Sequence, residues 1–183
     1  MTDSSTTPDP RHVIDFWRDA GYRKWFARDD AFDARFRDGF LDAHWAAARR
    51  ELESWMGGAD GALALILLLD QFPRNCFRRT GHAYATDSLA RHYAARTIDA
   101  GFDTQADPAL RVFVYLPFEH SEDMADQLRC VELVRALDPE YMKYAVAHRD
   151  VIERFGRFPH RNRELGRVNT PDEQAWLDAG GGF

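Results

Sequence analysis

The chain has 183 residues, of which 45% are hydrophobic and 30% charged, and its formal net charge is −6. This composition is typical of one folded domain and excludes a wholly disordered chain. The acidic balance argues against nucleic-acid binding, which needs a broad basic surface. The longest apolar run, residues 62–69, is far shorter than the ~20 residues of a membrane span, so we expect neither nucleic acid nor membrane as a partner.

The N-terminal residues and the cysteines indicate the compartment. Residues 1–8 are rich in Ser, Thr, Asp and Pro, and no secretion signal is recognisable there. We therefore expect a disordered tail over residues 1–8 and a single helical domain over residues 9–183. Two cysteines, Cys76 and Cys130, are too few for a disulfide framework. Together these features predict a cytoplasmic protein with reduced thiols.

The N-terminal third shows helix signals in chain order. Asp9-Pro10 supplies an N-cap residue followed by proline at the first helical position, and Gly21 ends that helix. Phenylalanines then repeat every four residues between positions 32 and 40, which predicts a second helix with one apolar face.

A third helix is predicted from Gly61 to about Phe72. Its centre reads Ala-Leu-Ala-Leu-Ile-Leu-Leu-Leu, and leucine and alanine favour helix over strand. Because it is apolar on every side, we expect it to be the most buried helix of the fold. Pro73 is expected to end or kink it.

The C-terminal half repeats the same start signals. Helix starts are predicted at Thr86 or Asp87, at Asp107-Pro108, at Ser121 as N-cap, at Asp138-Pro139 and at the capping box of Thr170-Pro171-Asp172-Glu173. Pro117 should end the helix before the Ser121 cap, and Gly180 to Gly182 should form a frayed end. No convincing strand is present. The sequence thus predicts an all-α fold of about seven or eight helices in antiparallel pairs.

The segment from Arg154 to Arg167 departs most from the acidic average. It holds five arginines, one histidine and one glutamate. Arginine forks bind carboxylate or phosphate, so the segment is either an anion-binding loop or a loop fixed to the acidic body by structural ion pairs. We expect Arg154, which ends a packed helix beside Phe155, to be structural and Arg161 to be functional.

Two other polar segments, residues 70–75 and 117–123, also lie at predicted helix corners. Since the three segments carry complementary charges, we expect them to form one concave site. The candidate ligand-binding residues are Asp70, Arg74, Asn75, Glu119, His120, Arg157, His160, Arg161 and Asn162. Of these, we expect Asp70, Glu119, His120, Arg157, His160 and Arg161 to line the concave region. His148 lies on a buried helix face, where a hydrogen-bonded core role is more common than catalysis.

Catalytic and metal signatures are weak. Glu119 and His120, with the acidic residues 122–123, offer metal-ligand types, but no pair has the spacing that places two ligands on one helix face. We therefore expect no metal and no cofactor. The chain has no nucleophile-elbow motif and no phosphate-binding glycine loop. Glu119, His120 and His160 are candidates for acid/base catalysis because corners often carry catalytic groups.

Three motifs carry a family resemblance. They are Leu-Leu-Leu-Asp-Gln-Phe-Pro-Arg-Asn at 67–75, Tyr-Leu-Pro-Phe-Glu-His-Ser-Glu-Asp at 115–123, and Arg-Phe-Gly-Arg-Phe-Pro-His-Arg-Asn at 154–162. In order and spacing the chain resembles the uncharacterised bacterial family known as domain-of-unknown-function family 924. The resemblance implies an all-helical fold similar to tetratricopeptide-repeat superhelices, and it brings no established activity.

Three functions remain open at this point. The leading hypothesis is a cytoplasmic helical binding module that holds an anionic small molecule or an acidic peptide group against the Arg/His cluster. The alternative is a hydrolase or lyase acting on an anionic substrate, with Glu119 or His120 as the acid/base group. The third is a structural interaction protein without a ligand.

Overall fold

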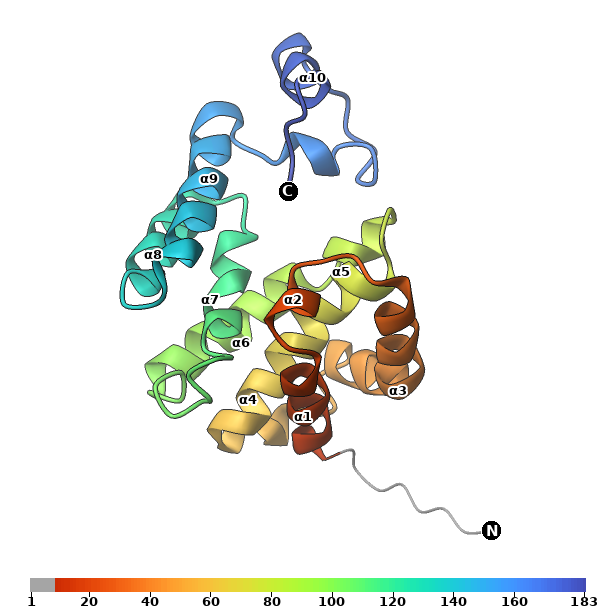
Figure 1. Ribbon diagram of the computed structural model, residues 1–183, viewed down its shortest axis with the longest axis vertical. Helices are drawn as coiled ribbons and strands as arrows, with labels where there is room; N and C mark the ends of the chain where they lie inside the picture. Colours follow the sequence, from red (N-terminus) through yellow and green to blue (C-terminus); the bar gives the residue numbers. More distant parts are fainter. Residues whose placement is uncertain (1–8) are drawn as a thin grey trace.

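The computed structural model describes residues 9–183, so the tail predicted over residues 1–8 lies outside the described residues. All regular secondary structure in residues 9–183 is helical (Figure 1). The α-helices are α1 (Pro10–Ala20), α2 (Tyr22–Trp25), α3 (Asp30–Ala48), α4 (Ala59–Ile66), α5 (Phe72–Cys76), α6 (Asp87–Asp99), α7 (Val112–Glu119), α8 (Met124–Val134), α9 (Pro139–Phe155) and α10 (Pro171–Asp178). The other helical segments are η1 (Glu53–Gly57), η2 (Leu67–Gln71), η3 (Gly81–Tyr84) and η4 (Pro159–Arg161).

The predicted all-α class is confirmed, since residues 9–183 contain no β-strand. Segments α4, η2 and α5 form one continuous rod, and α2 is a single turn. With the rod counted once and α2 set aside, eight helices remain, within the predicted number. Helices α7, α8 and α9 follow one another through short links and pack side by side, as antiparallel neighbours do.

The helix-start signals act largely as predicted. Asp9 accepts a hydrogen bond from the Arg11 backbone N–H at 2.9 Å, and Asp138 accepts one from Glu140 at 2.8 Å. Thr170 and Glu173 form the predicted capping box at the start of α10. These bonds satisfy backbone donors that a helix N-terminus leaves without partners.

The predicted Ser121 cap is wrong, and Asp123 takes its place. The Asp123 carboxylate accepts from the Ala125 backbone N–H at 2.7 Å. The Ser121 hydroxyl instead donates to Asp126 at 2.7 Å and accepts from the Asp123 N–H at 3.2 Å. A carboxylate carries full charge at the helix terminus, so it outcompetes the hydroxyl for this position.

Helix α4 and the following turn lie at the centre, as predicted. Residues 62–69 are at most 1% exposed. Helix α4 packs against α1, α6 and α7, which surround it (Figure 1). The rod is therefore buried on every side between Gly61 and Asp70, which accounts for the lack of polar residues in that stretch.

The rod does not end at Pro73. A π-helical turn, η2, lies just before this proline, and helix α5 continues beyond it. In the π turn the Phe72 N–H bonds to the Leu67 carbonyl, five residues back. Because proline has no N–H, this widened turn leaves carbonyls without backbone donors. Side chains replace those donors: His44 contacts the Leu68 carbonyl at 2.8 Å, Thr86 donates to that of Leu69 at 2.5 Å, and Arg74 to that of Asp70 at 2.9 Å.

Pro117 also fails to end its helix, contrary to prediction. It lies inside α7, which continues to Glu119, and the His120 N–H still bonds to the Leu116 carbonyl at 2.9 Å. In the last turn of a short helix, proline removes one backbone bond without preventing the next. The extra turn carries Glu119 and His120 inward, both largely buried.

Segments η4 and α10, with the loops that join and follow them, form a separate C-terminal layer over the rest of the molecule, which we call the body (Figure 1). Helix α10 lies far from α1 and α4, and the chain end turns back from α10 toward the middle of the molecule (Figure 1). A small second core of Val151, Ile152 and Phe158 holds this layer, with Trp176 packed on it. Gly180 to Gly182, predicted as a frayed end, lead to Phe183, and Gly182 and Phe183 line a cavity below.

Candidate functional site

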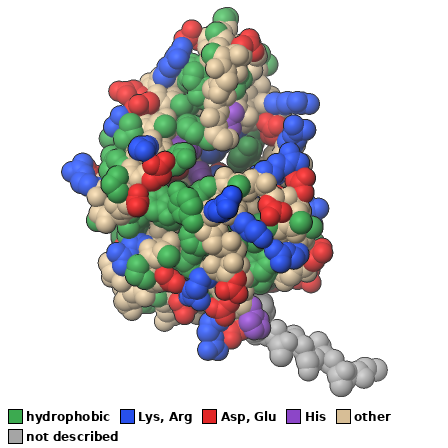
Figure 2. Space-filling model, in the orientation of Figure 1, with side chains coloured by type: hydrophobic (Ala, Val, Ile, Leu, Met, Phe, Trp, Pro, Cys, Tyr) green, Lys and Arg blue, Asp and Glu red, His purple; other side chains and the backbone are tan. Residues whose placement is uncertain are grey.

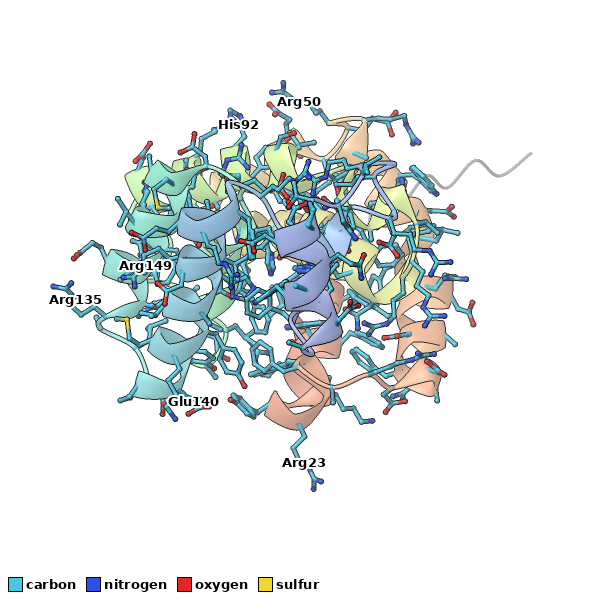
Figure 3. All side chains as sticks on the ribbon, turned by 90° about the horizontal axis from the view of Figure 1, so that it is seen from above. Arg23, Arg50, His92, Arg135, Glu140 and Arg149 are labelled. Carbon is cyan, nitrogen blue, oxygen red and sulfur yellow. The ribbon has the colours of Figure 1, made fainter. Side chains whose placement is uncertain are left out.

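A cavity of about 550 Å³ lies between the C-terminal layer and the body. Figure 2 shows a hollow there, with histidine side chains visible inside it. Basic and imidazole groups line part of the wall: Arg74, Arg78, Arg79, His120, His160 and Arg161. Aromatic rings line another part: Tyr22, Phe26, Tyr84, Tyr141, Tyr144 and Phe183. The polar side chains labelled in Figure 3, such as Arg23, Arg50 and Glu140, lie at the periphery of the molecule and point outward.

Five predicted site residues line this cavity: Arg74, Glu119, His120, His160 and Arg161. They come from α5, from the end of α7 and from η4, which are the three predicted segments. The Phe-Pro bend at residues 158–159 starts η4 and directs His160 and Arg161 into the hollow.

Asp70 lies directly behind the cavity wall and is fully buried. Its carboxylate accepts from Arg74 at 3.0 Å and contacts His120 Nδ1 at 2.8 Å. Burial alone would raise the pKa of Asp70, but Arg74 and His120 lower it, so the group is a carboxylate. We expected Asp70 to line the region; it instead anchors two residues that do.

Asp87 completes the charge network. Arg74 bonds both of its oxygens, at 2.8 and 2.9 Å, and Arg161 lies 3.4 Å from one of them. Two buried arginines therefore face two carboxylates, Asp70 and Asp87. The network is close to neutral, as a buried cluster must be.

His120 is held in one orientation by this network. Because Asp70 is ionised, the imidazole donates its Nδ1–H to it, which leaves Nε2 as a hydrogen-bond acceptor. His120 also lines the cavity. Burial and the nearby Arg74 lower the pKa of His120, which keeps the ring neutral. A neutral imidazole with one fixed N–H is the form that accepts protons.

Glu119 has an unusual environment for a carboxyl group. Its nearest polar neighbours are His148 Nδ1, 3.5 Å from one oxygen, and the Cys130 thiol, 3.9 Å from the other. Burial, reinforced by the negative charge of Asp70, raises the pKa of Glu119 to about 8. The group is therefore largely protonated at neutral pH and can donate a proton or a hydrogen bond.

Arg161 is the less satisfied of the two buried arginines, Arg74 and Arg161. Its side chain is only 6% exposed. One nitrogen donates to the His120 carbonyl at 2.9 Å, whereas buried Nε has no protein partner among residues 9–183. The guanidinium lies between the rings of Tyr84 and Phe158, at 4.8 and 4.3 Å. Burial and the charge of Arg74 lower the pKa of Arg161 to about 10.

His160 beside it is similarly incomplete. Its buried Nδ1 has no hydrogen-bond partner in the part of the chain that the structure describes. Burial, helped by the charge of Arg161, lowers the pKa of His160 to about 4. Buried polar atoms are normally paired, so two incomplete neighbours at a cavity wall indicate a place for a ligand or water.

Four residues of the arginine-rich and Asp70 segments lie away from the cavity. Arg157, predicted to line it, binds Glu173 with two bonds of 2.6 and 2.7 Å. Asn162 donates to Asn169, and Asn75 donates to Asp33, both at 2.7 Å. Arg154 is half exposed, lies over the Phe155 ring at 4.6 Å and reaches Asp172 at 3.5 Å, so its ion pair is weaker than that of Arg157.

Several lining residues were not predicted from sequence. Arg78 and Arg79 continue the residue 70–75 motif, and their adjacent positive charges were an available signal. Arg79 adopts a positive φ of 62°, which is rare for a side chain of this size and occurs often at functional sites. His148 is hydrogen-bonded, as expected, through Nδ1 to the Tyr144 carbonyl at 2.9 Å, yet it also lines the cavity.

Two kinds of feature are absent from residues 9–183. No group of three or more His, Cys, Asp and Glu side chains is placed to hold a metal ion. None of the helices in this range combines the length and the apolar character needed to cross a bilayer.

Both cysteines are buried free thiols, and burial raises the pKa of Cys76 to about 12.

Fold and site together define a class: an all-helical protein whose C-terminal layer closes a cavity lined by arginine, histidine and aromatic side chains. The chain belongs to the family described as bacterial proteins of unknown function, DUF924, whose model matches residues 13–181. It is similar to the solved structure of a protein of unknown function, ATU0120, from Agrobacterium tumefaciens. The two are 55% identical over 93% of this chain and 97% of that chain, with a TM-score of 0.91. No match is found among the curated proteins.

Proposed function

We propose that the protein binds a small molecule with an anionic group in the cavity between its C-terminal layer and its body. The observation that carries the proposal is the incomplete bonding of Arg161 and His160 at the cavity wall. An anion placed there accepts hydrogen bonds from a guanidinium that the protein itself only partly satisfies.

The charge balance of the lining supports this proposal. Arg74 and Arg161 are matched by Asp70 and Asp87, and Glu119 is largely neutral. Arg78 is paired with Asp33, whereas the exposed Arg79 makes no ion pair within 4.0 Å among residues 9–183, so it adds a positive charge that no carboxylate balances locally. A carboxylate or phosphate brings the opposite charge into a site of low dielectric, where each contact is stronger.

A thermal-shift titration with inorganic phosphate and with citrate tests the proposal. We expect both anions to raise the Tm of the parent protein and of Arg154→Met, because Arg154 is half exposed and distant from the cavity. Arg161→Met should lose most of this stabilisation. Equal stabilisation of the parent and of Arg161→Met, or none in either, would show that these anions do not bind at Arg161.

The contact between Asp70 and His120 favours a second candidate, an acid/base enzyme acting on the same anionic molecule. With Nδ1 held by Asp70, His120 Nε2 can take a proton from water while the water oxygen attacks an ester or amide carbon. Glu119, adjacent in the chain, can then give its proton to the departing oxygen or nitrogen. Atoms balance in this hydrolysis, and no cofactor is required.

The pH profile tests this candidate against simple binding. On a panel of anionic aryl esters, activity should fall above about pH 8, where Glu119 loses its proton. Glu119→Gln should remove activity but retain phosphate binding, and Asp70→Asn should reduce activity strongly. Turnover by His120→Gln equal to that of the parent would exclude His120 as the base.

A further inference from the structure

Phe183 stacks on the imidazole of His148 at one side of the cavity. The two ring centroids are 3.6 Å apart and the ring planes meet at 12°. The Phe183 ring also meets Phe158 and His160 nearly edge-on, at 6.2 and 5.7 Å. Three rings therefore form a slot that holds one flat ring, with His148 as its floor.

The tail that brings Phe183 here is shaped by its glycines. Gly181 passes so close to Trp176 that a Cβ atom would lie 2.3 Å from the indole ring. Gly182 has a φ of 134°, a conformation that side chains rarely adopt. Gly180 and Gly181 close the end of α10 with backbone bonds of 2.9 Å to Leu177 and Trp176. The direction of the tail is thus set by the backbone of residues 180–182.

Phe183 itself is weakly held. It is 57% exposed, and no backbone hydrogen bond fixes Gly182 or Phe183 within residues 9–183. His148, in contrast, is fixed by its bond to the Tyr144 carbonyl at 2.9 Å, and burial keeps it uncharged by lowering its pKa to about 3. His148 is therefore the rigid partner of the stack, and Phe183 is the weakly held partner that another ring can replace.

We propose that the slot above His148 is the subsite for a planar ring of the ligand, and that Phe183 occupies it until the ligand displaces it. The ligand class is an aryl carboxylate or aryl phosphate. Phe158 connects the two subsites, because Arg161 lies over it at 4.3 Å while Phe183 meets its edge. One small molecule can then place its ring on His148 and its anion against Arg161. This inference specifies the ligand of the proposed function and rests on it for the anionic half only.

Four probes separate ring from charge: phenyl phosphate, cyclohexyl phosphate, inorganic phosphate and benzyl alcohol. Their dissociation constants are measured by calorimetry for the parent and for Phe183→Ala, whose half-exposed side chain makes misfolding no concern. We expect Phe183→Ala to bind phenyl phosphate about fivefold more tightly, since a stack no longer has to be displaced. Inorganic phosphate should bind both proteins equally, and cyclohexyl phosphate should gain less than phenyl phosphate.

A second variant tests the floor of the slot. His148→Leu fills the position with an apolar side chain but removes the ring, so it should abolish the preference for phenyl over cyclohexyl phosphate. Equal affinities of these two probes for Phe183→Ala, or weaker binding of phenyl phosphate than in the parent, would overturn the inference. If Arg161→Met leaves every anion unaffected while Phe183→Ala still favours rings, the anion site fails and the ring subsite stands.

Discussion

Arg157 and Arg161 lie four residues apart in one segment, yet their hydrogen-bond partners differ. Arg157 forms two short bonds to Glu173, whose carboxylate also accepts from the Thr170 backbone at 2.7 Å. Arg161 faces the cavity with a buried Nε that has no partner among the described residues, and burial lowers its pKa. The comparison teaches that charge density alone does not distinguish an arginine with a complete ion pair from one with incomplete bonding at the cavity wall.

The largest expected effect comes from the charge network behind the cavity. Asp70→Asn leaves Arg74 facing only Asp87 and removes the charged partner of His120, both deeply buried. Breaking such a pair costs about 3–5 kcal/mol, or roughly 6–20 °C in Tm for a chain of this size. Differential scanning calorimetry measures it. A fall of only one or two degrees would mean that the network is not what holds α5 to α7.

Arg157→Met should have the next largest effect. It removes both bonds to Glu173 and frees the capping box of α10, so we expect the Tm to fall by roughly 3–8 °C. Arg154→Met is the matched control, because its ion pair is half exposed and long; its Tm should change by less than about 2 °C. The reverse ranking would restore Arg154 as the structural arginine.

The pH dependence of the free energy of unfolding tests whether Glu119 is protonated in the folded protein. Folded Glu119 keeps its proton up to about pH 8, whereas the unfolded group loses it near pH 4.5. The folded state therefore binds more protons between these values, and the parent should lose stability relative to Glu119→Gln as the pH rises. The slope cannot exceed roughly 1.4 kcal/mol per pH unit, and the difference should level off above pH 8. Urea unfolding at several pH values measures it, and a difference independent of pH would mean an ordinary pKa.

Arg161→Met should have only a small effect on stability without ligand, like the control Arg154→Met. It loses the bond to the His120 carbonyl and the contacts with two rings, but it also removes a buried and incompletely bonded charge. These contributions oppose each other, so the Tm should change by less than about 3 °C. A larger fall than for Arg157→Met would place Arg161 among the structural residues.

Local signals explain why the fold was predictable. Caps such as Asp9 and Thr170, and the apolar rod of residues 62–69, act through neighbours in the sequence, so their outcome is decided locally. The predictions at Ser121 and Pro117 failed for local reasons, whereas the path of the rod past Pro73 depends on distant side chains. There, His44 and Thr86 provide hydrogen-bond partners for the Leu68 and Leu69 carbonyls from distant parts of the chain, and no local sequence pattern predicts these bonds.

The site was predictable in its segments but not in its orientations. Residue type and corner position indicated the stretches that carry His120 and Arg161. They could not distinguish Arg157 from Arg161, because the short turn η4 decides which of the two faces the cavity. His148 has the sequence features of a core residue, and only the structure shows that it also lines the cavity, with Phe183 stacked on its ring.

The π turn at residues 67–71 has a consequence for how the wall of the cavity responds to insertion or deletion. A π turn holds one residue more than the α-helix it interrupts, so it amounts to a one-residue insertion. Because the π turn absorbs the extra residue, deleting Leu69 should restore the regular hydrogen-bond spacing without turning Asp70 and Arg74 away from α7. Ala62 to Leu68 should keep their places in the core. The wall of the cavity should therefore tolerate the gain or loss of one residue in the rod.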